Sequence, residues 1–343
     1  MINFFHLNKK NILKLSIILV LVCMVCLTYY LMKTKRNNKL NSKIKLCLGL
    51  PLQPQSSLLI IALEKGLFKK YGLQICVKEY PSGKRVLNEG FFTNKMDLAS
   101  AADLPVAKAA IMRNNFKIIA SICIADNVNS IISRKNAGIA AISDLKGKRI
   151  ATQKNSAVHY FLELFLAEHL ISKKDINLSF MKAEDLPMAL AEGKIDAFSM
   201  REPYIEQAKN LLKNNNIVFS IPGLYTQYEV LLLKEDFLKK YPYVTNKILK
   251  ALFEAEKYIQ EFPDKSFSLI ANRLNIEKKS ISKLFSDFSF QISLDQSLII
   301  RLEDEARWII SDQKIKDKSV PNYLKFIHQE TLQKLRPESI SIF

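Results

Sequence analysis

The chain has 343 residues, of which 48% are hydrophobic, and this is enough apolar material for one large domain or two modest ones. Its net charge of +18 is uneven, because residues 1–43 hold eight basic and no acidic side chains, whereas residues 44–343 hold 43 basic and 33 acidic ones. The body after residue 43 has no dense basic stripe with interleaved aromatic residues, so we expect no nucleic-acid partner.

The predicted elements begin with an uncharged apolar run, Leu15–Met32. This run is at the short end for a bilayer span and longer than a typical signal-peptide core, and no small residues suited to cleavage follow it. We therefore predict one N-terminal transmembrane helix over residues 15–32 that acts as an uncleaved anchor, with a cleaved signal as the alternative. The C-terminal flank is the more basic one, and charge counting alone would leave the body inside the cell. Residues 33–42 are a predicted linker.

The body then alternates strand-like and helix-like segments. Strands are predicted at 44–50, 73–80, 97–100, 116–124 and 130–133, with helices at 58–65, after 81–83, and at 104–112. The alternation restarts after Gly147, with strands at 149–152, 178–181, 195–199 and 217–221, helices at 157–171, 186–192 and 202–212, and an apolar run at 230–233. This pattern is typical of mostly parallel sheets flanked by helices.

The two alternating stretches predict an α/β fold with two lobes joined by two chain crossings. We assign residues 44–133 and 228–343 to lobe 1, residues 134–227 to lobe 2, and residues 1–43 to the anchor and linker. A cleft is expected where strand ends of the two lobes face each other. The C-terminal part is predicted to be helical, over 236–262, 264–274, 294–311 and 320–335, with apolar stripes that indicate core packing.

Asp144–Tyr160 contains a short strand, a polar loop and a helix for which Ser156 is a suitable N-cap. Backbone N–H groups at such a helix start lack intrahelical partners, and together with the helix dipole they suit an anion or a polar head group. Many α/β proteins contain the same unit with nothing bound there. An occupied site and an ordinary turn are therefore both compatible with this stretch.

The cysteines and histidines give weaker indications. Cys47, Cys76 and Cys123 lie in apolar strand-like runs, where buried thiols are common, and a disulfide between Cys47 and Cys76 is left open. Four scattered histidines argue against a metal site. We expect neither a metal nor a cofactor.

Five segments, in order and at consistent spacing, resemble the substrate-binding proteins of the nitrate/sulfonate/taurine class of ABC importers (the SsuA/THI5-like, or NMT1, family), which also covers binders of thiamine-pyrimidine precursors. The segments are ALEKGLFKKYGL (62–73), YPSG (80–83), MDLASAADLP (96–105), DLKGKRIA with NSAVHY (144–160) and LAEGKIDAFSMREPY (190–204). The resemblance implies a periplasmic-binding-protein-like clamshell of type II with a small polar ligand in its cleft. It also implies ABC permease and ATPase partners, a monomer, and a place on the extracytoplasmic (periplasmic) face of the bacterial inner membrane.

The same resemblance implies which residues bind the ligand. They are Gln53, Gln55, Ser56 and Ser57 after the first strand, Ser82 and Gly83, Ala101 and Asp103, and, from lobe 2, Asn155, Ser156, Ala157, His159 and Glu202, with Tyr160 just behind. The chain departs from the family where Ala99, Ala102 and Asn155 replace small or glycine residues, and where Met200-Arg201 replaces an aromatic. For each residue a local role in a turn or a cap is the competing interpretation.

Two ligand classes fit this set. A sulfonate or similar anion would use serine hydroxyls and helix N-termini, and Glu202 would then have to cap its own helix or lie far from the anion. An amine or aminopyrimidine would instead use Glu202 as its acceptor. Ligand capture is expected to close the lobes by a hinge near Ser133–Arg134 and Gln227–Glu229.

Two functions are alternatives to solute binding. The first is a pyrimidine synthase, because a fungal enzyme group shares the family, but that group has a cysteine-rich segment that is absent here, and His159 lies on an apolar helix where a core position is more common. We therefore predict no catalytic residue and no enzyme activity. The second is a membrane-tethered ligand sensor, which would need a signalling partner because no output domain follows the binding body.

Overall fold

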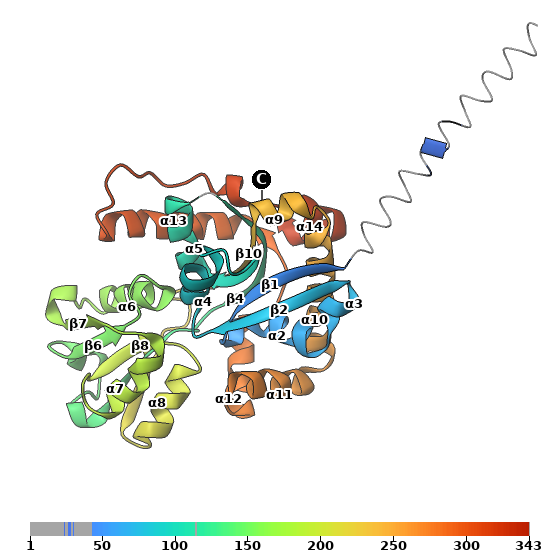
Figure 1. The fold of residues 1–343 in the computed structure, drawn as a ribbon. Coiled ribbons are helices and arrows are strands. Elements are labelled where there is room, and N and C mark those ends of the chain that lie inside the picture. Colours follow the sequence, from blue (N-terminus) through green and yellow to red (C-terminus); the bar gives the residue numbers. More distant parts are fainter. Residues whose placement is uncertain (1–23, 25–26, 29, 31–42, 114, 343) are drawn as a thin grey trace, which may run out of the picture. The chain divides into compact units, whose positions relative to one another are not determined.

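The computed structural model describes residues 24, 27–28, 30, 43–113 and 115–342 (Figure 1). The chain separates into two units, residues 1–43 and residues 44–343, and the fold below is that of the second unit. The transmembrane helix predicted at 15–32 lies mostly outside the described residues. Among those that are described, no helix has the length and apolar character needed to span a bilayer.

The sheet of lobe 1 has six strands in the order β11-β4-β10-β3-β1-β2 (Figure 1). Their bounds are β1 (Ile44–Pro51), β2 (Leu73–Tyr80), β3 (Leu98–Ala102), β4 (Phe116–Ala125), β10 (Gln227–Lys234) and β11 (Phe288–Ser289). β1 pairs in parallel with both β2 and β3, whereas β10 is antiparallel to β3 and to β4. The C-terminal ends of β1, β2 and β3 therefore lie at one edge of the sheet.

The sheet of lobe 2 has five strands in the order β7-β6-β8-β5-β9. Their bounds are β5 (Ser130–Arg134), β6 (Arg149–Thr152), β7 (Asn177–Phe180), β8 (Ala197–Met200) and β9 (Asn216–Phe219). β6 is parallel to β7 and β8, whereas β5 is antiparallel to β8 and β9. The C-terminal ends of β6 and β8 share an edge, and the loops after them carry the lobe 2 residues of the expected site.

The α/β alternation predicted two lobes with mostly parallel sheets, and in each sheet four strands share one direction. In each lobe the strand that follows a chain crossing, β5 or β10, inserts antiparallel into the middle of the sheet, and both sheets are therefore mixed. Alternation along the chain does not reveal the direction of a strand that arrives from the other lobe. β5 also belongs to the sheet of lobe 2, so the first crossing lies at 126–129 and the second at 220–226.

The expected hinge positions lie inside strands. Ser133–Arg134 lies within β5 and Gln227–Glu229 lies within β10, and the register of both strands is held by pairing on two sides. The crossing segments 126–129 and 220–226 belong to no strand, so we expect a hinge motion to be absorbed there.

The helices surround the sheets in separate groups (Figure 1). In lobe 1, α10 packs on α2, α3 and α11, and α13 packs on α5; in lobe 2, α7 packs on α8. The bounds are α2 (Ser57–Glu64), α3 (Leu67–Lys70), α4 (Gly83–Arg85), α5 (Asp103–Met112), α6 (Ala157–Glu168), α7 (Leu186–Ala191), α8 (Tyr204–Leu212), α9 (Glu235–Lys240), α10 (Val244–Glu261), α11 (Pro263–Leu274), α12 (Lys278–Leu284), α13 (Gln296–Asp312) and α14 (Glu330–Leu335). A π-helix, η2 (Val86–Phe91), follows α4, and a small sheet pairs β12 (Leu294–Asp295) with β13 (Ile340–Ser341).

Two of the predicted C-terminal helices are interrupted. The helix expected over 236–262 is divided into α9 and α10 at Pro242, because proline cannot donate the helical hydrogen bond and disfavours a helical residue before it. The helix expected over 320–335 is reduced to α14. The stretch before it contributes a β-bridge between Ile327 and Ile118 at the first sheet.

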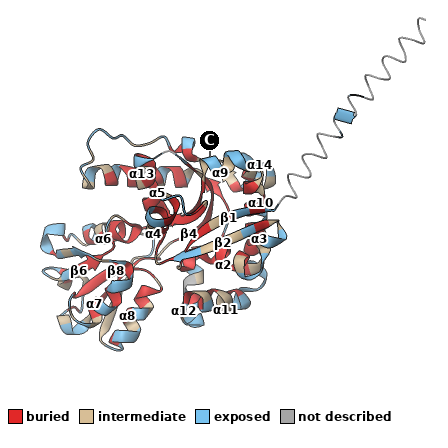
Figure 2. Ribbon diagram, in the orientation of Figure 1, coloured by how far each residue is buried: buried red, intermediate tan, exposed pale blue. Residues whose placement is uncertain are grey.

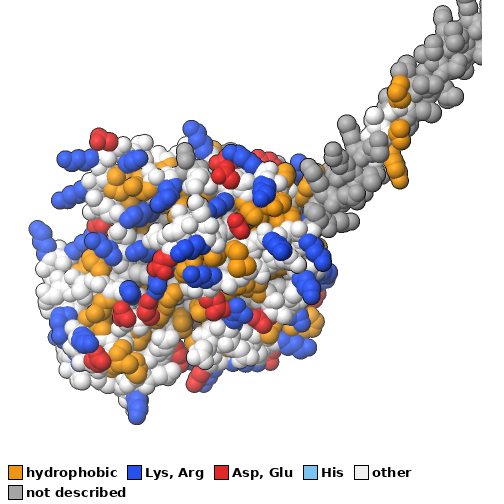
Figure 3. Space-filling view, viewed as in Figure 1, with side chains coloured by type: hydrophobic (Ala, Val, Ile, Leu, Met, Phe, Trp, Pro, Cys, Tyr) orange, Lys and Arg blue, Asp and Glu red, His pale blue; other side chains and the backbone are white. Residues whose placement is uncertain are grey.

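Burial is concentrated in the strands and in the helix faces that cover them (Figure 2). One large apolar cluster fills lobe 1 and continues through α6 into lobe 2, where a second, smaller cluster surrounds Phe198 and Ile205. Each fully buried leucine or phenylalanine contributes about 2 kcal/mol through the hydrophobic effect. Acidic and basic side chains are interspersed on the face of the body shown in Figure 3, in agreement with its modest basic excess.

Candidate functional site

The loops that follow the strands of the two lobes meet and are joined by hydrogen bonds. Tyr204 Oη of lobe 2 donates to the carbonyl oxygen of Pro81 in lobe 1 at 3.1 Å, and Gln153 Nε2 donates to Ser82 Oγ at 3.1 Å. On the exposed side of the junction, Arg85 of α4 forms an ion pair with Glu184 of lobe 2. The lobes are therefore closed on each other, and Ser82, one of the residues expected to bind a ligand, lies at their junction.

A buried polar network crosses the centre of this junction. Arg201, at the end of β8, is only 4% exposed and donates to Gln53 Oε1 from Nε at 3.0 Å and from a terminal nitrogen at 2.6 Å. Gln53 Nε2 in turn donates to Glu229 Oε2 at 2.8 Å, and Ser100 Oγ donates to Glu229 Oε1. A guanidinium of one lobe is thus linked to a carboxyl group of the other through a single glutamine.

Burial shifts the acidity of both charged members of the network. It raises the pKa of Glu229 to about 7, although the hydrogen bond from Ser100 and the nearby Arg201 charge act in the opposite direction. Burial also lowers the pKa of the Arg201 guanidinium. A charge that binds next to this network would therefore change the protonation of Glu229.

Several buried carboxamides at this edge of lobe 1 have unused hydrogen-bonding capacity. Gln55 is 1% exposed, and neither atom of its amide group has a partner among the described residues. Asn129 Nδ2 donates to Gln227 Oε1 at 3.4 Å, but Asn129 Oδ1 and Gln227 Nε2 have no partner there. Leaving a buried polar group unpaired costs about 1 to 3 kcal/mol, so such groups mark positions where a polar molecule can bind.

The other predicted residues of lobe 1 discussed here stabilise the conformation of the loops in which they lie. The hydroxyl groups of Ser56 and Ser57 donate to the carbonyl oxygens of Pro51 and Pro54, at 2.8 and 2.5 Å, and are engaged in the turn. Ser82 caps α4. A Cβ atom at Gly83 would lie 2.7 Å from Ala101 Cα, which explains why glycine is required where these two loops touch.

The lobe 2 loop before α6 has an unusual backbone. Asn155 adopts a φ of 54°, which asparagine tolerates better than most residues, and its side-chain Oδ1 is buried without a described partner. Ser156 and Ala157 are buried behind it, and Ser156 Oγ donates to the carbonyl oxygen of Gln153 at 2.5 Å. Asn155 is therefore the residue of this loop that is available to a ligand through its side chain.

Three further predicted residues are engaged in structural contacts. Asp103 Oδ1 accepts from Tyr225 Oη at 2.8 Å and its Oδ2 accepts from the backbone N–H of Tyr228 at 3.0 Å, so it fastens the returning chain to α5. Glu202 Oε2 accepts from the backbone N–H of Glu206 at 2.8 Å and thus binds its own helix. Glu202 therefore has the local role of a helix cap, whereas the partners of Asp103 lie 122 and 125 residues further along the chain, so its role is not local.

His159 is the third predicted residue that is engaged in structural contacts. Its ring is 3% exposed and lies against Phe180 and Trp308, with ring centroids 5.0 and 5.5 Å away, and Nε2 is 3.2 Å from Glu163 Oε1. Tyr160 likewise contacts Trp308 and Tyr225. The His159 environment is that of a packed side chain between α6 and α13.

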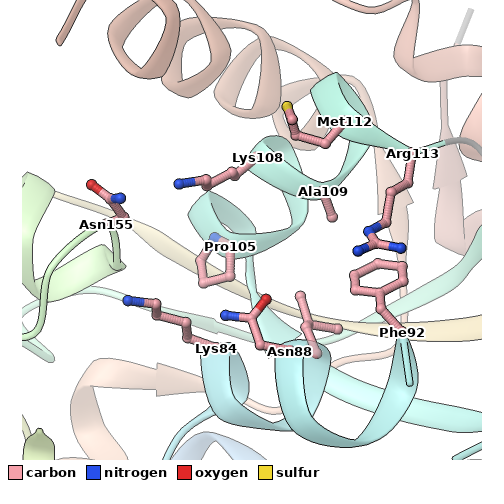
Figure 4. A pocket seen from close by; sticks show the side chains of 10 residues that line it. Lys84, Asn88, Phe92, Pro105, Lys108, Ala109, Met112, Arg113 and Asn155 are labelled. Atoms are coloured by element: carbon pink, nitrogen blue, oxygen red, sulfur yellow. The ribbon is translucent and has the colours of Figure 1, made fainter. Parts of the chain in front are cut away.

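A cavity of about 200 Å³ opens between η2, α5 and the lobe 2 loop, and both lobes line it (Figure 4). In Figure 4 the side chains of Lys84 and Lys108 extend toward the lobe 2 loop that carries Asn155, and Arg113 lies against Phe92 at the far end of the cavity. Its remaining lining residues are Leu87, Asn88, Pro105, Ala109 and Met112, so none of the described lining residues is acidic. A cavity with several cations and a partly apolar wall suits an anion that carries an aliphatic part.

The lysines at this cavity are held close together. Lys84 Nζ donates to the carbonyl oxygen of Lys154 across the junction, and Lys108 Nζ donates to Gln313 Oε1 at 2.8 Å. Burial, together with the charges of Lys108 and Lys154, lowers the pKa of Lys84 to about 8. Within the described part of the chain neither Lys84 nor Lys108 forms an ion pair, and an anion would relieve this repulsion.

Arg201, Glu229, Lys84 and Lys108 were not among the predicted site residues. Arg201 directly follows the apolar strand β8, and Glu229 lies at the start of the apolar run of β10. A charged residue beside a buried strand is a usable signal, because such a side chain is rarely buried without a partner. The lysines gave no comparable signal in so basic a chain.

Two α/β lobes that are linked by two crossings and meet at polar loops define a fold of the periplasmic-binding-protein class. The chain belongs to the NMT1/THI5 like family, which matches residues 53–266. It is similar to a putative aliphatic sulfonates-binding protein of Bacillus subtilis (strain 168), with 25% identity in an alignment of length 246 that covers 69% of this chain and 72% of that protein.

Solved structures share the fold. The periplasmic aliphatic sulphonate binding protein SsuA from Escherichia coli aligns with a TM-score of 0.69 and 20% identity, over 84% of this chain and 98% of that chain. The periplasmic nitrate-binding protein NrtA from Synechocystis PCC 6803 aligns with a TM-score of 0.67 and 14% identity, over 86% and 88% of the two chains. The desulfurization enzyme DSZB also shares the fold, with a TM-score of 0.62 and 14% identity over 86% and 99%. The fold by itself therefore does not separate binders from enzymes.

Proposed function

We propose that the protein is an extracytoplasmic solute-binding protein that captures a small anion, such as a sulfonate or nitrate, between its lobes and delivers it to an ABC importer. The observation that carries this proposal is the cationic, partly apolar cavity in which Lys84 and Lys108 of lobe 1 face Asn155 of lobe 2. Because both lobes line the cavity, an anion bound there favours the closed arrangement. The names of the sulfonate- and nitrate-binding relatives agree with this class of ligand.

The position of Glu202 favours an anion over an amine. Its carboxylate accepts the backbone N–H of Glu206, so it is engaged as a helix cap and does not offer its charge to an amine or an aminopyrimidine. Arg201 adds a buried positive charge at the junction. A sulfonate, taurine or nitrate fits this balance of charges better than a thiamine-pyrimidine precursor does.

We further propose that residues 15–32 anchor the protein to the bacterial inner membrane with the body on the extracytoplasmic face, and that an ABC permease and ATPase take up the captured solute. We expect no catalysis. His159, the histidine that the sequence placed near the site, is packed between Phe180 and Trp308.

A thermal-shift screen of the purified protein tests the ligand class. The panel contains alkanesulfonates, taurine, nitrate, an aminopyrimidine and a polyamine, and we expect stabilisation by the anions and taurine alone. Lys108→Gln should reduce the shift, whereas Lys250→Gln, which removes an exposed lysine of α10, should preserve it. Stabilisation by the aminopyrimidine or the polyamine, or an unchanged anion shift in Lys108→Gln, would contradict the proposal.

A further inference from the structure

Two cysteines lie directly opposite each other in the first sheet. The parallel register of β1 and β2 pairs Cys47 with Cys76, and the pairing runs without a break from Ile44 and Leu73 to Pro51 and Tyr80. Cys47 is half-buried and Cys76 is exposed, whereas Cys123 is buried in β4. The expectation of buried thiols is therefore wrong for Cys47 and Cys76, because their face of the β1–β2 edge is open to solvent.

The backbone places the two thiols within the range of a disulfide bond. Neighbouring strands lie about 4.8 Å apart, and the Cα atoms of disulfide-bonded cysteines are about 4.4 to 6.8 Å apart. Paired residues of parallel strands project to the same face of the sheet, and the neighbouring outward positions Lys45 and Gln74 are exposed as well. The proximity of the Cys76 thiol, followed by burial, raises the pKa of Cys47 to about 11.

We propose that Cys47 and Cys76 form an intrachain disulfide when the body meets an oxidant of the disulfide class, such as oxidised glutathione. The exposed Cys76 thiolate attacks one glutathione sulfur, which forms a mixed disulfide and releases one glutathione thiolate. The Cys47 thiolate then attacks Cys76 Sγ, so the Cys47–Cys76 bond forms and the second glutathione leaves. The two cysteine protons pass to the two released thiolates, and the glutathione disulfide takes up both electrons.

The bond would fasten the segment that carries the lobe 1 side of the site. The chain between the two cysteines includes Gln53 and Gln55, and β2 leads directly into Ser82. Closing a loop of about 30 residues restricts the unfolded chain and should raise the melting temperature by about 5 °C. The proposal does not depend on the identity of the solute.

Peptide mapping of the full-length protein tests the bond. The protein is incubated with oxidised glutathione or with a reducing agent, free thiols are alkylated, and a non-reducing tryptic digest is analysed by mass spectrometry. We expect a linked pair of peptides, Leu46–Lys65 and Tyr71–Lys78, in the oxidised sample and two alkylated peptides in the reduced sample. Glutathione adducts or alkylation at both cysteines in the oxidised sample would overturn the proposal.

Melting temperatures of the same samples supply a second readout. Oxidation should raise the melting temperature of the wild-type protein and leave that of Cys76→Ser unchanged; this substitution is at an exposed position and preserves the fold. Cys123→Ala is the matched control and should retain the oxidation-dependent rise. A rise that persists in Cys76→Ser would assign the effect to other cysteines and overturn the assignment.

Discussion

Arg201 of lobe 2 donates two hydrogen bonds to a single atom of lobe 1, Gln53 Oε1, at 3.0 and 2.6 Å. Gln53 Nε2 in turn donates a hydrogen bond to Glu229 Oε2 at 2.8 Å. The contact links the two lobes in their closed arrangement. Lobe closure is therefore coupled to the charges of Arg201 and Glu229, and the first two predictions concern these two residues.

Replacement of Arg201 by glutamine should weaken anion binding by about tenfold to a hundredfold. The variant removes a buried positive charge and the charge-assisted hydrogen bonds to Gln53, and each such interaction contributes about 1.5 to 3 kcal/mol. Isothermal titration with the most stabilising sulfonate of the screen measures the change. Arg307→Gln, at an exposed arginine of α13, is the control, and equal affinities of the two variants would remove Arg201 from the site.

Glu229 should make the stability of the protein depend on pH near neutrality. Its pKa rises from 4.5 to about 7 on folding, so the folded protein holds this proton more tightly than the unfolded chain. The resulting stabilisation is complete below about pH 4.5 and is lost as the pH rises through about 7, a difference of about 2 to 3 kcal/mol between pH 5 and 8.

Denaturant unfolding of the wild type and of Glu229→Gln at both pH values measures this difference. The glutamine variant cannot titrate at this position, and its stability should fall less over the same interval than that of the wild type. A parallel decline of the two proteins would show that Glu229 keeps an ordinary pKa after folding.

Asn155→Trp should abolish the thermal shift caused by ligand. The indole side chain would fill the cavity between Lys84 and Lys108, and the left-handed backbone at this position adds a cost of about 1 kcal/mol without unfolding the body. Asn155→Gly keeps the backbone conformation and removes the amide alone, so it should retain most of the shift. Asn214→Trp, in an exposed turn of lobe 2, controls for the added bulk, and a full ligand shift in Asn155→Trp would place the ligand elsewhere.

Removal of residues 1–42 should leave a body that folds cooperatively. β1 begins at Ile44, and residues 44–343 form a unit of their own with their own apolar core. Circular dichroism and thermal melting of the shortened protein measure this. Persistent insolubility would indicate that the body depends on the N-terminal residues, and it would argue against their interpretation as an anchor.

Much of the architecture could be predicted from the sequence, because it is encoded in local patterns. The strands and helices from Ile44 to Phe219 follow from apolar runs, turn residues and caps, and most of their bounds agree with prediction within a few residues. What local patterns could not show is the direction of β5 and β10, since the placement of each depends on partners that lie far along the chain.

The residues of the candidate site also differ in whether they could be predicted from the sequence. The resemblance to a family led to Gln53, Ser82 and Asn155, which the structure brings to the junction of the lobes. Arg201 and Glu229 were missed because their significance lies in a contact through Gln53, with 148 and 176 residues of sequence separating the partners. Conversely, Asp103 and Glu202 fit a family pattern, but each is engaged by a neighbouring backbone N–H group.

The central place of β10 in the first sheet has a consequence for biosynthesis. β10 separates β3 from β4, yet it is made after all the strands of lobe 2. A growing chain therefore exposes two open strand edges in its N-terminal half until residue 234 has left the ribosome, while residues 130–219 already contain a complete sheet. The later-encoded lobe can be the first to fold, and a chain made only up to β9 still lacks Glu229 and with it the link from Arg201 through Gln53.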